Sequence, residues 1–99
     1  MAALVLRARG LRVLARNVRV RGAAEVDLLA RAGSTLVLVE VKARRAGGAA
    51  EAVDERRRRN LRRAGEVLLA DPAHSWASAV RFDVVALDGF SIRYLRDAF

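Results

Sequence analysis

The chain has 99 residues, a formal net charge of +8 and a hydrophobic share of 54%. This length gives one folded domain over residues 1–99, and the hydrophobic share excludes an intrinsically disordered chain. Because cysteine is absent, disulfides, zinc–thiolate sites and thiol catalysis are excluded. No apolar run approaches the roughly 20 residues that cross a bilayer, and no segment has the form of a signal peptide. The sequence therefore predicts a cytoplasmic protein with no membrane partner.

The positive charge comes from 19 lysines and arginines against 11 acids. Such an excess favours a polyanionic partner, most simply nucleic acid, because arginines that neutralise phosphates release counterions. The alternative is that arginine is frequent because the genome is GC-rich, in which case the chain is a protein-interaction domain. Salt dependence separates the two, since phosphate binding weakens steeply as the salt concentration rises.

The first half of the chain predicts a short helix followed by three strands. The helix spans residues 2–9 and ends at Gly10 as its C-cap. An extended stretch begins at residues 11–14, and apolar and basic residues alternate along residues 17–21, as in a half-exposed strand. Strands follow at residues 25–30 and 36–42. Because short turns connect these strands, we expect an antiparallel meander.

The second half predicts a loop, a long helix and two more strands. Small residues over residues 43–52 indicate the loop, and Asp54 is a suitable N-cap for a helix that runs to about residue 70. Residues 80–87 and 90–95 then predict two strands joined by a turn. The order helix, three strands, helix, two strands predicts an α/β fold.

Two acids fall on strands that pair across a predicted two-residue turn. If Ala32 pairs with Thr35 beside this turn, the register places Asp27 directly opposite Glu40. Opposed carboxylates destabilise a sheet, and a divalent metal that they hold together with water is the usual resolution. Lys42 lies two positions after Glu40 and therefore on the same face.

These residue types suit the metal-dependent hydrolysis of a phosphodiester. Asp27, Glu40 and the backbone carbonyl of Val41 are the candidate ligands of Mg²⁺ or Mn²⁺, which lowers the pKa of a bound water. Lys42 is the candidate cation beside that water or a phosphate oxygen. Glu25 is either an outer-shell acid or the ion-pair partner of a nearby arginine. The plain alternative is that Glu40 and Lys42 form a surface ion pair worth about 0–1 kcal/mol.

Three arginines near this motif are candidate phosphate contacts. Arg44 and Arg45 follow the motif directly, and Arg57 lies near the N-terminus of the long helix. The remaining arginines of that helix are expected to form a solvated face, part of which contacts the nucleic-acid backbone.

Other residues are predicted to be structural. Asp83, within an apolar strand, is expected to be a buried acid that is hydrogen-bonded or paired with an arginine, rather than a metal ligand. Aromatic residues near the C-terminus, Phe90 among them, are expected in the core or in an interface.

The chain resembles the bacterial YraN-like family, most specifically at EVDLLA (residues 25–30) and LVLVEVKAR (residues 36–44). The resemblance covers nearly the whole chain and continues at residues 10–19, 52–57, 81–85 and 97–99. This family is placed in the PD-(D/E)xK nuclease-like superfamily, near archaeal Holliday-junction resolvases. The resemblance implies a restriction-endonuclease-like core, with a mixed sheet of about five strands flanked by helices. It also implies catalytic positions for Asp27, Glu40 and Lys42.

Two departures from the family pattern concern the candidate site. The family begins with a longer helix that carries a Gly-x-x-x-Glu pattern, whose glutamate can complete the metal site. Here the helix is shortened and no acid precedes Glu25, so either the true start lies upstream or the protein lacks that ligand. The family's lysine early in the long helix is Arg57 in this chain, which replaces a point charge with a bidentate fork.

Two functions are therefore expected. The first is a Mg²⁺-dependent endonuclease that acts on structured or branched DNA. The alternative is a nucleic-acid-binding module of the same fold without cleavage, which the missing N-terminal acid favours. A homodimer is expected if the substrate is a Holliday junction, because two active sites must then act on opposed strands.

Overall fold

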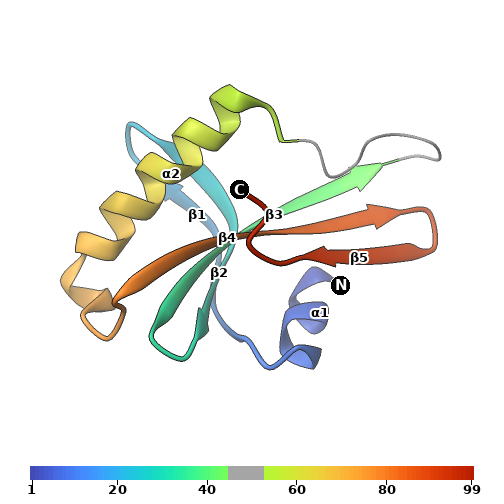
Figure 1. Cartoon of the computed structure of the whole chain (residues 1–99), viewed down its shortest axis with the longest axis horizontal. Coiled ribbons are helices and arrows are strands. Elements are labelled where there is room, and N and C mark those ends of the chain that lie inside the picture. The colour runs from blue at the N-terminus through green and yellow to red at the C-terminus, as the bar shows by residue number, and fades with distance from the viewer. Residues whose placement is uncertain (45–52) are drawn as a thin grey trace.

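A five-stranded mixed sheet carries one helix on each face (Figure 1). The structure is a computed structural model and describes residues 1–44 and 53–99. Its elements are α1 (Ala2–Ala8), β1 (Arg12–Val20), β2 (Ala24–Ala32), β3 (Thr35–Arg44), α2 (Glu55–Ala70), the 3-10 helix η1 (Pro72–His74), β4 (Ala79–Asp88) and β5 (Ser91–Leu95). This order confirms the α/β fold predicted from the sequence. No helix within the two described ranges is long and apolar enough to cross a membrane.

The strands lie side by side in chain order, from β1 to β5. β1, β2 and β3 form the predicted antiparallel meander, and β5 is antiparallel to β4. β3 and β4 are parallel. Parallel neighbours need a long crossover, and α2, which lies on one face of the sheet, forms part of the crossover between β3 and β4 (Figure 1).

The sheet separates two apolar cores. In the α2-face core, Leu61 and Leu68 of α2 pack with strand residues that include Leu38. In the α1-face core, Leu6 of α1 packs with strand residues that include Val39. Consecutive residues of β3 are thus buried on opposite sides, as predicted for a central strand that is covered on both faces.

Several element ends differ from the sequence prediction. β1 begins at Arg12, within the extended stretch predicted from residues 11–14, and ends at Val20 rather than at residue 21; Asn17 within it has a left-handed backbone with φ of 51°. Asparagine adopts this conformation more readily than most residues because its side chain can bond locally. β3 continues to Arg44, so the first two residues of the predicted loop 43–52 belong to the strand. The other eight lie outside the described residues.

Phe90 lies outside the core, so of its two predicted roles only the interface stays a prediction. β5 begins at Ser91, so Phe90 lies in the β4–β5 turn instead of in a strand, and its side chain is fully exposed. The last strand was predicted to begin at residue 90, but the turn after Asp88 extends one residue further.

Candidate active site

β2 and β3 separate next to the two predicted acids. Their register agrees with the prediction, and the pairing ends with Leu28 opposite Val39. One position further, the same register brings Asp27 opposite Glu40. The N–H of Val41 donates a hydrogen bond of 2.8 Å to Oδ2 of Asp27. The Asp27 carboxylate thus accepts a bond that a main-chain carbonyl of β2 would accept in a continuous ladder.

Asp27 also lies where β2 changes face. Alternate residues of a strand normally share a face, but Val26 packs in the α2-face core and Leu28 packs in the α1-face core. The pairing between β1 and β2 omits Asp27 and Asn17, the residue with the left-handed backbone. This local irregularity leaves the Asp27 side chain free to lie between β2 and β3.

Glu40 is bound by an arginine from α2. Its side chain is only 5% exposed, and both carboxylate oxygens accept from Arg57, with Nε to Oε2 and Nη2 to Oε1 both at 2.9 Å. The same Nη2 donates to the backbone carbonyl of Glu25 at 2.7 Å. Nζ of Lys42 lies 3.6 Å from Oε2 of Glu40. Two acids and two cations therefore meet at this point, and their formal charges cancel.

The two carboxylates have opposite pKa shifts. Burial, together with the neighbouring Glu40 charge, raises the pKa of Asp27 although the Val41 N–H opposes the shift. Burial alone would raise the pKa of Glu40 as well, but the hydrogen bonds and charge of Arg57 outweigh it and hold that pKa below its ordinary value. The surroundings therefore destabilise the ionised form of Asp27, whereas Arg57 stabilises the ionised form of Glu40.

The donor set fits a metal that is shared with a phosphate. Mg²⁺ is typically held by one or two carboxylates, with water and phosphate oxygens completing the shell, and Asp27 and Glu40 supply two. Within residues 1–44 and 53–99, no group of three His, Cys, Asp or Glu side chains could hold a metal without such help. Both oxygens of Glu40 already accept from Arg57, so an ion would have to compete with that guanidinium.

The other predicted residues lie around this centre. Asp27 and Val41 line a cavity of about 350 Å³, and Lys42 is 35% exposed.

Glu25 has an exposed side chain and is paired with Arg19 in the β1–β2 register. Arg44 is the last residue of β3, opposite Asp88 of β4, and Arg45 lies outside the described residues. Arg57 was predicted to contact phosphate; its guanidinium lies on Glu40, and contact with phosphate stays a prediction.

Comparison with known proteins identifies the family. The sequence profile described as "Uncharacterised protein family UPF0102" matches residues 1–87. The chain belongs to this family. The UPF0102 protein of Ralstonia pickettii is 46% identical over 101 residues, which cover 95% of this chain and 79% of that protein. The UPF0102 protein YraN of Salmonella arizonae is 44% identical over 98 residues, which cover 95% and 74%. The resemblance to the YraN-like family is confirmed.

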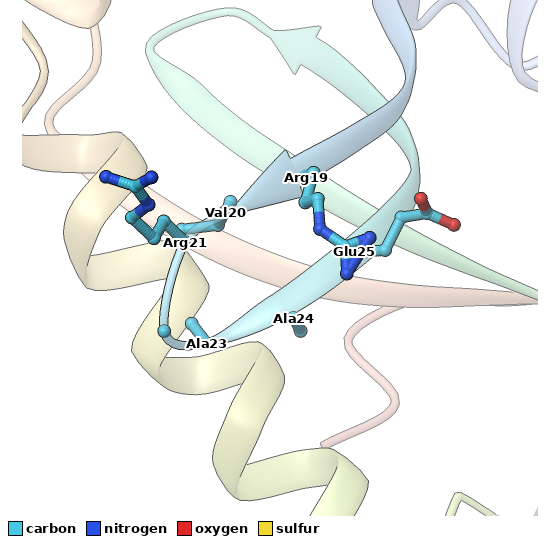
Figure 2. A pocket seen from close by; sticks show the side chains of 7 residues that line it. Arg19, Val20, Arg21, Ala23, Ala24 and Glu25 are labelled. Carbon is cyan, nitrogen blue, oxygen red and sulfur yellow. The ribbon is translucent and has the colours of Figure 1, made fainter.

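The structure also has a basic surface at the β1–β2 turn, which was not predicted from the sequence. A cavity of about 710 Å³ lies at the β1–β2 turn and is lined by Arg19, Arg21 and Glu25. In Figure 2, Arg19 and Glu25 extend to one side of the turn and Arg21 to the other. α2 is bonded to the same turn, because Arg63 donates to the carbonyl of Gly22 at 3.3 Å. The alternation of basic and apolar residues along β1 was the available signal.

The prediction for Asp83 is confirmed. This acid is 0% exposed, and its oxygens accept from Nε and Nη2 of Arg81 at 2.9 and 3.0 Å. The backbone N–H of Asp97 donates to it at 2.9 Å, and the hydroxyl of Tyr94 donates to it as well. All four donors come from β4, β5 or the residues after β5, so Asp83 ties the C-terminal segment to the sheet.

Proposed function

We propose that this protein is a Mg²⁺- or Mn²⁺-dependent nuclease that hydrolyses phosphodiesters in structured or branched DNA. The observation that carries the proposal is the meeting of Asp27 and Glu40 at the point where β2 and β3 separate, with Lys42 beside them. Like charges on opposed strand positions destabilise a sheet, and a metal ion held by both carboxylates would account for their proximity.

Each residue of the site has a chemical role in this proposal. Asp27, Glu40 and the carbonyl of Val41 hold the ion, which when bound supplies the Lewis acidity that activates water. The ammonium of Lys42 stabilises the charge that develops on the phosphate in the transition state. Arg57 moves from Glu40 toward a phosphate oxygen, since its fork suits phosphate as well as carboxylate.

The surrounding charge supports DNA as the substrate. Exposed arginines lie at the β1–β2 turn and along α2, at positions 19, 21, 56, 59 and 63. The formal net charge of +8 gives the same indication. Side chains of this kind bind the phosphate backbone irrespective of sequence, and their contribution weakens as salt rises.

A non-catalytic nucleic-acid-binding module is the second candidate. One observation favours it: Arg57 occupies both oxygens of Glu40, and the four charges of the site already balance. In this alternative the acids only position Arg57 and the basic surface binds DNA.

Calorimetric titration of Mg²⁺ and Mn²⁺, with and without a short DNA duplex, tests the proposal. We expect the wild type to bind metal and to cleave a junction, a flap or single-stranded DNA. Glu40→Gln should lose both properties, whereas Lys42→Ala should keep metal binding and lose cleavage. Glu66→Gln removes the same charge from an exposed position of α2 and serves as the control. Salt-dependent DNA binding without metal binding or cleavage would establish the non-catalytic module, and absence of DNA binding would exclude both.

A further inference from the structure

Three arginines surround a small cavity on the α1 face of the sheet. The cavity has a volume of about 210 Å³, and its lining includes Arg9, Arg81, Tyr94 and Arg96. These residues come from the end of α1, from β4, from β5 and from the segment that follows β5. The fold brings Arg9 and Arg81 to the pair Tyr94 and Arg96, from which they lie far apart in the sequence. Glu40 of the proposed nuclease centre contacts α2 on the opposite face, and the cavity that Asp27 and Val41 line is a separate one that shares no residue with this cavity.

Two of the arginines are held in place by a buried network. The guanidinium of Arg81 makes two hydrogen bonds to Asp83, which is fully buried and also accepts from the Tyr94 hydroxyl. Cζ of Arg9 lies 4.4 Å from the centroid of the Tyr94 ring, at cation–π distance. Arg9 and Arg81 are thus positioned through Tyr94 and Asp83 before any ligand binds, which lowers the entropic cost of binding one.

The charges around this cavity do not balance. Asp83 is the only acid in the network, and its two oxygens already accept four donors. In the part of the chain that the structure describes, neither Arg9 nor Arg96 has a carboxylate at ion-pair distance. Asp83 compensates the charge of Arg81, so the guanidinium groups of Arg9 and Arg96 are the unbalanced charges at this cavity, and an anion between them would compensate them.

We propose that this cavity is a binding site for a phosphate group. Guanidinium forks match phosphate oxygens in geometry as well as charge. A water molecule takes about 30 Å³, so a cavity of about 210 Å³ admits one phosphate and part of the molecule that bears it. The phosphate belongs either to a small molecule or to a nucleic-acid strand. The site does not depend on the proposed nuclease activity, because it shares no residue with that centre.

Nuclear magnetic resonance of the whole chain provides the test, with inorganic phosphate as the first probe. Phosphate replaces chloride at constant ionic strength, and the Nε–Hε signals of the arginines are followed. We expect saturable shifts for Arg9 and Arg96, and a loss of affinity of about tenfold or more in Arg9→Gln and in Arg96→Gln, since a charge-assisted hydrogen bond contributes about 1.5–3 kcal/mol. Arg7→Gln removes the same charge from an exposed position of α1 that does not line the cavity, and should bind like the wild type.

Two oligonucleotides then distinguish the sources of the phosphate. If a strand with a 5′-phosphate displaces inorganic phosphate and the same strand with a 5′-hydroxyl does not, the site takes a terminal phosphate. Displacement by both strands assigns it to backbone phosphates, and displacement by neither assigns it to a small molecule. The proposal is overturned if no saturable shift appears through the millimolar range, or if Arg9→Gln, Arg96→Gln and Arg7→Gln weaken binding equally.

Discussion

Glu40 and Asp83 are buried acids on neighbouring parallel strands, and each is bound by an arginine fork, but they differ in everything else. Glu40 contacts α2, whereas Asp83 lies on the α1 side with Val39 as its partner in the register. The arginine that binds Asp83 is two residues away on the same strand, and the arginine that binds Glu40 is 17 residues away on a helix. Asp83 accepts from two further donors, while Glu40 has a second carboxylate beside it.

This difference separates a structural acid from a functional candidate. Asp83 contacts hydrogen-bond donors of Arg81, Tyr94 and Asp97, so this acid strengthens the junction of β4 with the C-terminal segment. The Glu40 centre contains a conflict, because burial and the neighbouring charge of Glu40 together raise the pKa of Asp27. Unfavourable interactions of this kind persist where function requires them. The comparison therefore predicts that mutations at the two acids have different consequences.

The largest effect is expected for Asp83→Ala. It leaves Arg81, whose side chain is 15% exposed, without its acidic partner, and loss of one member of a buried ion pair typically costs about 3–5 kcal/mol. Urea unfolding should show a decrease of this size in the free energy of unfolding. Asp97→Asn removes an exposed carboxylate but keeps the backbone N–H that binds Asp83, and should change stability little. A decrease below about 1 kcal/mol in Asp83→Ala would contradict the structural role.

Arg57→Gln should have an intermediate effect, about 2 kcal/mol, because hydrogen bonds to charged groups contribute about 1.5–3 kcal/mol and Lys42 stays 3.6 Å from Glu40. The lowered pKa of Glu40 fixes the pH dependence. Its ion pair stabilises the fold above the ordinary glutamate pKa of about 4.3, and this contribution is lost as the pH falls through the lowered folded-state value. The difference from wild type should therefore shrink in acid.

Arg62→Gln is the matched control for that measurement. Arg62 lies on the same helix, is 47% exposed and forms an ion pair of 3.7 Å with Glu55. Exposed pairs contribute about 0–1 kcal/mol, so this variant should stay close to wild type. If the effect of Arg57→Gln does not change with pH, the bond from Arg57 to the Glu25 carbonyl, rather than the pair with Glu40, accounts for the loss.

Much of this arrangement was predictable from local sequence patterns. The turn at Gly33-Ser34 sets the register that brings Asp27 toward Glu40, and an acid within an apolar strand must be paired, as Asp83 is. The fork of Arg57 was not predictable in the same way. Helical periodicity shows which face of α2 carries this residue, but not that the crossover brings it within 2.9 Å of β3. The left-handed backbone at Asn17 likewise depends on pairing that no local pattern encodes.

The smallest change in the free energy of unfolding is expected for Asp27→Asn, and this change is an increase rather than a decrease. The pKa of Asp27 is raised, so the protonated form stabilises the fold below the ordinary aspartate pKa of about 3.9, and this contribution is lost as the pH rises through the folded-state value. The asparagine keeps an oxygen for the Val41 N–H without the charge. It should therefore stabilise the fold near pH 7 by up to about 1 kcal/mol, the usual range for opposed like charges, and lose this advantage in acid. Thermal unfolding at several pH values measures both.

The same Asp27→Asn variant should bind Mg²⁺ or Mn²⁺ more weakly, because a neutral amide replaces one of two carboxylates. Gained stability together with lost metal binding would mean that the conflict between Asp27 and Glu40 is retained for a ligand, as at active sites where function opposes stability. A stabilised variant whose metal and DNA binding match those of the wild type would contradict the proposal that Asp27 belongs to a catalytic metal site. A destabilised variant would show that the Asp27 charge is compensated by Arg57 and Lys42 after all, which would make this acid as structural as Asp83.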